Sequence, residues 1–91
     1  MSEKDALIDK LEAERKRAEA ELETLQAQAQ SKAADAALRQ QYETQRRELE
    51  SGGDDIDDRL QQLQEGGEAA FAELKEGAER ALDRLKSALG G

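Results

Sequence analysis

The sequence predicts an all-α protein whose long amphipathic helices form a coiled coil or a helical hairpin, and three observations lead to this class. Strong helix formers (Ala, Leu, Glu, Gln, Lys and Arg) fill most of the 91 positions, whereas Pro, Val and Trp are absent. Charged residues make up 40% of the chain, which is typical of long helices with an exposed polar face. Large apolar side chains also recur every eleven residues, at Leu38, Leu49, Leu60, Phe71 and Leu82.

The eleven-residue repeat is the most informative of these patterns. Three turns of α-helix take about 10.8 residues, so an eleven-residue step returns a side chain to nearly the same face. The repeat therefore predicts one apolar stripe along the helix. This stripe has to pack against another apolar surface, either of the same chain or of a partner. It keeps its phase across the pairs Gly52-Gly53 and Gly66-Gly67. A disordered chain has no reason to keep such a phase, so we expect folded helices despite the net charge of −8.

Residues 1–50 are predicted to form a long N-terminal helix. Ser2, with Asp5 three positions later, fits the start of a helix with a capping side chain. Between residues 27 and 37 the apolar side chains are all alanines, a segment that we interpret as exposed helix. Before that segment, an apolar stripe with spacings of three and four residues is interrupted by Arg15 and consists of Ile8, Leu11, Ala18, Leu22, Leu25 and Ala29.

Residues 51–54, Ser-Gly-Gly-Asp, are predicted to be either a Gly-rich turn or a weak point within a helix. Gly52 suits the left-handed position just after a helix, and Asp54 is a good residue to cap a new one. A reversal of the chain, however, has no need to keep the phase of the eleven-residue repeat. A hairpin at 51–54 and a continuous but weakened helix therefore both stay open.

Residues 55–91 are predicted to form a C-terminal amphipathic helix with a second weak point at residues 66–67. Glu68 is a poorer capping residue than Asp54, which makes this second glycine pair the less favoured place for a reversal. The spacing of the apolar side chains is the most regular in the chain, with Phe71, Leu74 and Ala78 followed by Leu82, Leu85 and Leu89.

The chain offers little for catalysis, and we expect a protein that is not an enzyme. It contains no His and no Cys, which are the commonest general base and thiol nucleophile. Four carboxylates at residues 54–58 come in pairs after two glycines, unlike the alternating ligands of a calcium loop. We attribute them to the start of a helix, where negative charge is favourable. No metal and no cofactor are expected.

Charge and hydrophobicity also restrict the partners. Residues 54–79 carry nine acidic residues against Arg59 and Lys75, a balance of −7 that repels phosphate, so nucleic acid is not expected as a partner. No apolar run is long enough to span a membrane, and the first residues lack the apolar core of a signal peptide, which makes the cytoplasm the expected location. A membrane surface is disfavoured because the apolar stripe is narrow and acidic.

The chain carries the segment EGGEAAFAELKEGAERALDRLKSAL over residues 65–89, which is preceded by Tyr42, Leu49, Leu60 and Leu63. With these residues, most of the chain resembles a group of small bacterial coiled-coil proteins of unknown function. In that group a helix rich in Lys, Glu and Ala leads through a Gly-containing joint into an aromatic-x-x-Leu-Lys-x-Gly segment. The corresponding residues here are Phe71, Leu74, Lys75 and Gly77, with Phe where the group often has Trp. The resemblance implies a bacterial coiled coil without an assigned activity, so it assigns no functional residue to this chain.

Together these observations predict a non-catalytic structural or adaptor protein that self-associates as a homo-oligomer through its eleven-residue repeat. Seventeen large apolar residues in 91 leave a single chain short of core, which favours a second copy or another protein partner. The alternative is an amphipathic helix protein that coats a lipid or hydrophobic granule surface. The predicted association seam consists of Leu38, Leu49, Leu60, Leu63, Phe71, Leu74, Leu82, Leu85 and Leu89.

Overall fold

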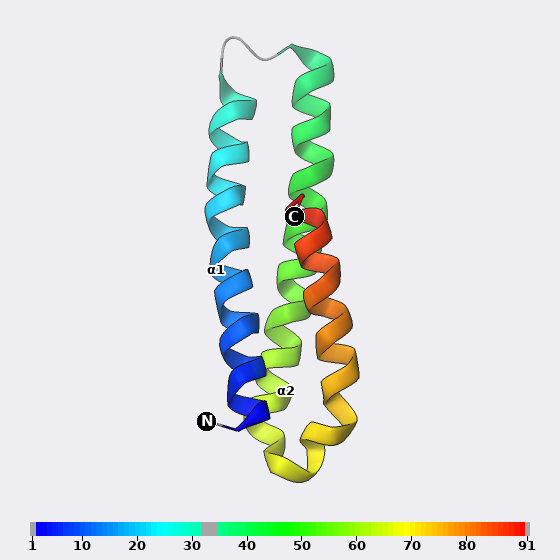
Figure 1. Ribbon diagram of the computed structural model, residues 1–91. Helices are drawn as coiled ribbons and strands as arrows, with labels where there is room; N and C mark the ends of the chain where they lie inside the picture. The colour runs from blue at the N-terminus through cyan, green and yellow to red at the C-terminus, as the bar shows by residue number, and fades with distance from the viewer. Residues whose placement is uncertain (1, 32–34, 91) are drawn as a thin grey trace.

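The protein consists of two α-helices in a computed structural model that describes residues 2–31 and 35–90 (Figure 1). Helix α1 spans Glu3–Gln30, and helix α2 spans Ala36–Ala88. The all-α fold class predicted from the sequence is confirmed. The predicted ranges also include residues 1, 32–34 and 91, which lie outside the described part of the chain.

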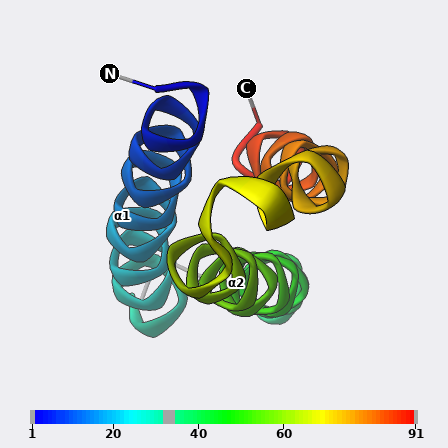
Figure 2. The ribbon, with the colours of Figure 1, turned by 90° about the horizontal axis from the view of Figure 1, so that it is seen from below.

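Helix α2 is bent back on itself at Gly67, which divides it into a first arm, residues 36–66, and a second arm, residues 68–88. The first arm runs antiparallel to α1, and the second arm turns back beside both (Figure 1). Seen along the long axis, α1 and the two arms lie at the corners of a triangle (Figure 2). The result is a three-helix bundle with extents of 51 × 20 × 19 Å.

Helix α1 begins at the predicted cap but is much shorter than predicted. The hydroxyl of Ser2 accepts a hydrogen bond from the backbone N–H of Asp5 at 3.1 Å, which confirms Ser2 as the N-cap. The helix then ends at Gln30 instead of continuing to residue 50. The buried residues of α1, from Leu7 to Leu25, therefore all lie within these 28 residues.

The predicted helix over residues 1–50 is corrected by a second cap at Asp35. The Asp35 carboxylate accepts the backbone N–H of Leu38 at 2.8 Å, and Asp35 itself is extended, with ψ 176°. An aspartate side chain that takes up a free N–H group at a helix start stabilises a new helix at that point. The new helix lies antiparallel to α1 (Figure 1), so residues 1–50 contribute to two helices and not to one.

Residues 51–54 do not form a turn; they lie inside the first arm of α2. Both glycines are helical and serve close packing between helices. A Cβ on Gly52 would lie 3.1 Å from Cδ1 of Leu85, and one on Gly53 would lie 3.0 Å from Nη1 of Arg15. The absence of a side chain at these two positions is therefore what lets the neighbouring helices approach α2.

The chain reverses at the second glycine pair, and the backbone of Gly67 explains why. Gly67 has φ 68° and ψ −174°, a combination that is essentially restricted to glycine. A Cβ placed there would have no atom within 4 Å, so backbone conformation and not space requires glycine. The weak point predicted at residues 66–67 is thus the hairpin of the fold.

An apolar core fills the space between α1 and the two arms of α2. No polar or charged side chain is buried among the residues that the structure describes. Ile8, Leu22 and Tyr42 are among the partly buried side chains that pack against this core. The core itself consists of Leu7, Leu11, Ala18, Leu25, Leu49, Ile56, Leu63, Phe71, Ala78, Ala81, Leu82 and Leu85.

Candidate association surface

Most of the predicted association seam is covered by the chain itself. Leu60, Leu74 and Leu89 are partly buried and pack against the core. Leu38 is the exposed member of the seam, with 36% of its surface accessible. The seam is therefore an intramolecular interface over most of its length, and self-association through it stays a prediction. The buried members are Leu49, Leu63, Phe71, Leu82 and Leu85.

The predicted seam omits several core residues that a seven-residue spacing in the sequence would have identified. On α1, Leu11, Ala18 and Leu25 are buried and stand seven residues apart, which is the spacing of one helix face. On α2, Ile56 is fully buried and stands seven residues after Leu49. A seven-residue repeat thus coexists with the eleven-residue repeat, and it describes the bundle core more completely.

The polar interruption at Arg15 is a contact between α1 and the first arm of α2. Its guanidinium Nε donates to both carboxylate oxygens of Asp57, at 3.1 and 3.2 Å. The guanidinium lies against Gly53, where a side chain would collide with it. The Arg15 side chain is 22% exposed and that of Asp57 is 52% exposed. This ion pair therefore lies at the rim of the core and joins the two helices there.

A similar contact joins the two arms of α2. A Cβ on Gly77 would lie 2.9 Å from Nη1 of Arg59, so the Arg59 guanidinium lies against the second arm where a side chain is missing. Asp55, one turn earlier on the first arm, has its carboxylate 3.6 Å from Arg59 Nε. Each of these glycines thus accommodates an arginine from the preceding helix of the bundle.

One end of the bundle is covered by two helices instead of three. The second arm ends at Ala88, and α1 and the first arm extend beyond it (Figure 1). We call residues 22–30 and 36–47 the open end. It contains the exposed Leu38 and a groove of about 490 Å³ between α1 and α2. The apolar part of the groove is lined by Leu22, Leu25, Ala29 and Tyr42.

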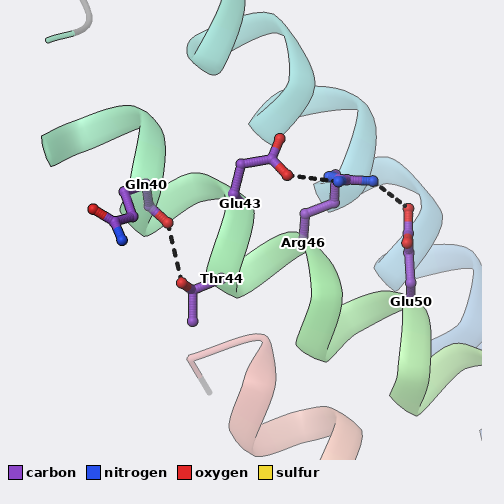
Figure 3. A network of polar contacts seen from close by, with 5 residues as sticks. All are labelled: Gln40, Glu43, Thr44, Arg46 and Glu50. Atoms are coloured by element: carbon purple, nitrogen blue, oxygen red, sulfur yellow. Dashed lines mark hydrogen bonds and ion pairs between the residues drawn. The ribbon is translucent and has the colours of Figure 1, made fainter. Parts of the chain in front are cut away.

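Charged side chains of α2 form the rim of this groove. Arg46 donates to Glu43 at 2.6 Å and to Glu50 at 3.1 Å, and the three side chains form a connected row (Figure 3). The hydrogen bond from Arg46 lowers the pKa of the Glu43 carboxyl below its ordinary value of 4.5. The same hydrogen bond raises the pKa of Arg46. The charged form of each of these two groups is therefore stabilised by the other.

The described residues provide surfaces for contact and little chemistry. Within residues 2–31 and 35–90, no group of three or more His, Cys, Asp or Glu side chains is arranged to hold a metal ion. None of the described helices is both long and apolar enough to cross a membrane. The features that stand out are the open end and the hinge at Gly67.

Comparison with known proteins does not identify a family for this chain. No family model matches it, and no curated protein or solved structure is detectably similar to it. The resemblance to bacterial coiled-coil proteins therefore stays a prediction, and the function has to be argued from the association surface.

Proposed function

We propose that this is a non-catalytic structural or adaptor protein that self-associates where its apolar repeat emerges from the bundle. The observation that carries the proposal is the exposure of Leu38 at the open end. Leu38 belongs to the same eleven-residue repeat as Leu49 and Leu60, which the bundle covers. A helix of another molecule that packs on the open end would cover Leu38 in the way that the second arm covers the rest of the repeat on the first arm.

The distribution of charge favours a second copy of the chain as the partner. Residues 22–48 contain four acidic and four basic residues, a balance of zero, so the whole net charge of −8 lies on the rest of the chain. Two copies that meet through residues 22–48 bring no net charge together, whereas contact through residues 54–79, with a balance of −7, brings acidic surfaces together. Like-charge repulsion between the remaining surfaces then disfavours side-by-side packing along the full bundle.

The rim of the groove also suits a symmetric contact. Arg39 and Arg46 alternate with Glu43 and Glu50 along α2. In a two-fold symmetric dimer each surface meets a copy of itself, so a rim of mixed sign can place arginines near glutamates of the partner. The apolar groove would receive the partner's Leu38 in the same contact.

The oligomeric state over a concentration series tests this proposal. We expect the chain to form dimers as its concentration rises and Leu38→Glu to dimerise much more weakly with unchanged helix content. Gln40→Glu is the matched control, because Gln40 is exposed and lies about 200° around the helix from Leu38. It adds the same charge and should leave the dimer intact. A chain that stays monomeric at every concentration, or a Leu38→Glu variant that dimerises normally, would overturn the proposal.

The lipid-coating alternative uses the same apolar residues and is separated by a second measurement. Most of the stripe that would face a lipid surface is buried in the bundle, so lipid binding requires the bundle to open. Circular dichroism with and without anionic or neutral vesicles reports this directly. Helix content that is present without vesicles and does not change when they are added supports the bundle. Helix content that develops only with vesicles supports the coating function instead.

A further inference from the structure

The apolar repeat of α2 keeps its phase across the point where the chain reverses. At about 100° per residue, a straight α2 would place all nine seam residues within a sector about 100° wide. Leu60 and Phe71, which lie on opposite sides of Gly67, would differ by only about 20°. The bent form does not need this agreement, since its two arms pack as separate helices. In a straight α2, by contrast, the apolar stripe is continuous only if the residues on both sides of Gly67 share the same phase.

From this agreement we propose that two copies of the chain exchange their second arms. In the exchanged dimer α2 straightens at Gly66-Gly67, and residues 68–88 of each copy pack against α1 and the first arm of the other. This inference rests on the proposed self-association but places it in the covered part of the repeat, away from the open end. The partner surface is the groove that the chain's own second arm fills in the monomer.

The reversal in α2 depends on the backbone conformation of a single residue. Gly67 is the residue with non-helical backbone angles inside α2, and no atom lies within 4 Å of the position its Cβ would take. A Gly67 side chain would therefore meet no obstacle, but Gly66 packs closely against the second arm, since a Cβ on Gly66 would lie 2.7 Å from the Cβ of Ala70, and straightening gives up that contact. Exchange of an identical element through a hinge is a common route from monomers to dimers.

The contacts of the second arm can all form again between two chains. Leu85 packs against Gly52, and Lys75 approaches Glu3 of α1 with Nζ 3.6 Å from the carboxylate. Each of these pairs joins the second arm to another part of the bundle, so exchange replaces a contact within one chain by the same contact between chains. The equilibrium then depends on concentration and on the conformation that the hinge prefers.

Gly67→Ala changes that preference in a known direction. Alanine is strained at φ 68° and ψ −174°, whereas it favours a straight helix more than glycine does. Both effects act in each of the two chains, so we expect the dimerisation constant to rise about a thousandfold. Gln64→Ala, an exposed position one turn before the hinge, is the control and should leave it within about threefold. Both are made together with Leu38→Glu, which weakens association through the open end.

A cross-link identifies the exchange directly. The chain has no Cys, and Ser51 and Ser87 line the same groove between the two arms of α2. We mix a chain carrying Ser51→Cys with one carrying Ser87→Cys, both with Gly67→Ala, and add a short bismaleimide reagent. Exchanged arms place each position 51 beside position 87 of the other chain. A cross-linked heterodimer is therefore expected, in clear excess over 51–51 and 87–87 products.

The outcomes separate this inference from the proposed function. A Gly67→Ala protein that stays monomeric, or that dimerises without the 51–87 link, overturns arm exchange and leaves association through the open end untouched. If Gly67→Ala does not fold, the same pair of cysteine variants is refolded from urea with Gly67 retained. A 51–87 link between chains after refolding at high but not at low concentration supports exchange, and its absence at both concentrations overturns it.

Discussion

The bundle predicts that two leucines of the same repeat respond very differently to truncation. Leu49 is fully buried between the helices, whereas Leu38 keeps 36% of its surface exposed at the open end. Both stand in the eleven-residue register. A uniform coiled-coil seam would make Leu49→Ala and Leu38→Ala about equally harmful, so the pair separates a bundle core from a seam between chains.

The expected magnitudes follow from burial. Replacing a fully buried Leu by Ala removes transfer free energy and leaves a cavity, which lowers the free energy of unfolding by about 3 kcal/mol. In a domain of this size that corresponds to a fall in Tm of roughly 12–24 °C. Truncation of Leu38 leaves no enclosed cavity and exposes little additional apolar surface. We expect its free energy of unfolding to fall by less than about 1 kcal/mol.

Urea and thermal denaturation followed by circular dichroism at 222 nm measure both effects. The comparison is made at a low protein concentration at which the chain is monomeric, so that association does not contribute. If Leu49→Ala is too unstable to analyse, Ile56→Val removes a single methyl group from a fully buried side chain and should cost about 1 kcal/mol. Equal losses for the Leu38 and Leu49 variants would refute the bundle as the source of stability.

Two further predictions concern single side chains of α2. Asp35→Ala should lower the free energy of unfolding by about 1 kcal/mol, because it removes the side chain that accepts the Leu38 N–H. Asp54 is exposed in the interior of the helix, so Asp54→Ala should change this free energy by less than about 0.5 kcal/mol. Urea denaturation of both variants checks the difference. The carboxyl of Glu43 should titrate by NMR with a midpoint below 4.5 and move back towards that value in Arg46→Gln. Because the pKa of this folded carboxyl is lowered, its contribution to stability is present above about pH 4.5 and is lost as the pH falls through the lowered pKa.

The helical class and the apolar face could be predicted because both depend on local properties. Helix propensity and the spacing of Leu49, Leu60 and Leu82 act within one helix, and the structure places these side chains in or against the core. The cap at Ser2 was equally accessible, since a serine three residues before a carboxylate is a local signal. The phase of the repeat continues through residues 51–54, which the helix passes, but also across residues 66–67, where the chain reverses, so the phase alone does not locate the reversal.

The path of the chain was harder to predict because it depends on contacts between distant residues. From local sequence alone, Gly53 is typical of a turn. In the fold it packs against Arg15, which lies 38 positions earlier in the chain. Asp54 looks like a cap, yet it remains an exposed residue in the helix interior. Asp35 was interpreted only as part of an exposed helix, although it caps α2. Local signals for turns and caps were present at several places, and tertiary packing selected among them.

The two glycine pairs show what distinguishes a hinge from a packing position. At Gly52-Gly53 the side chains of Leu85 and Arg15 lie 3.1 and 3.0 Å from the positions that a Cβ would take, so the absence of side chains there lets these neighbours pack closely. At Gly67 no neighbour is near, and only the backbone angles of the reversal require glycine. A chain that always stayed bent would have no reason to keep its apolar residues in phase across that point. The continuous phase within this one chain, together with a reversal that depends on the backbone of one glycine, therefore favours a bundle that can be closed by its own second arm or by that of a second copy.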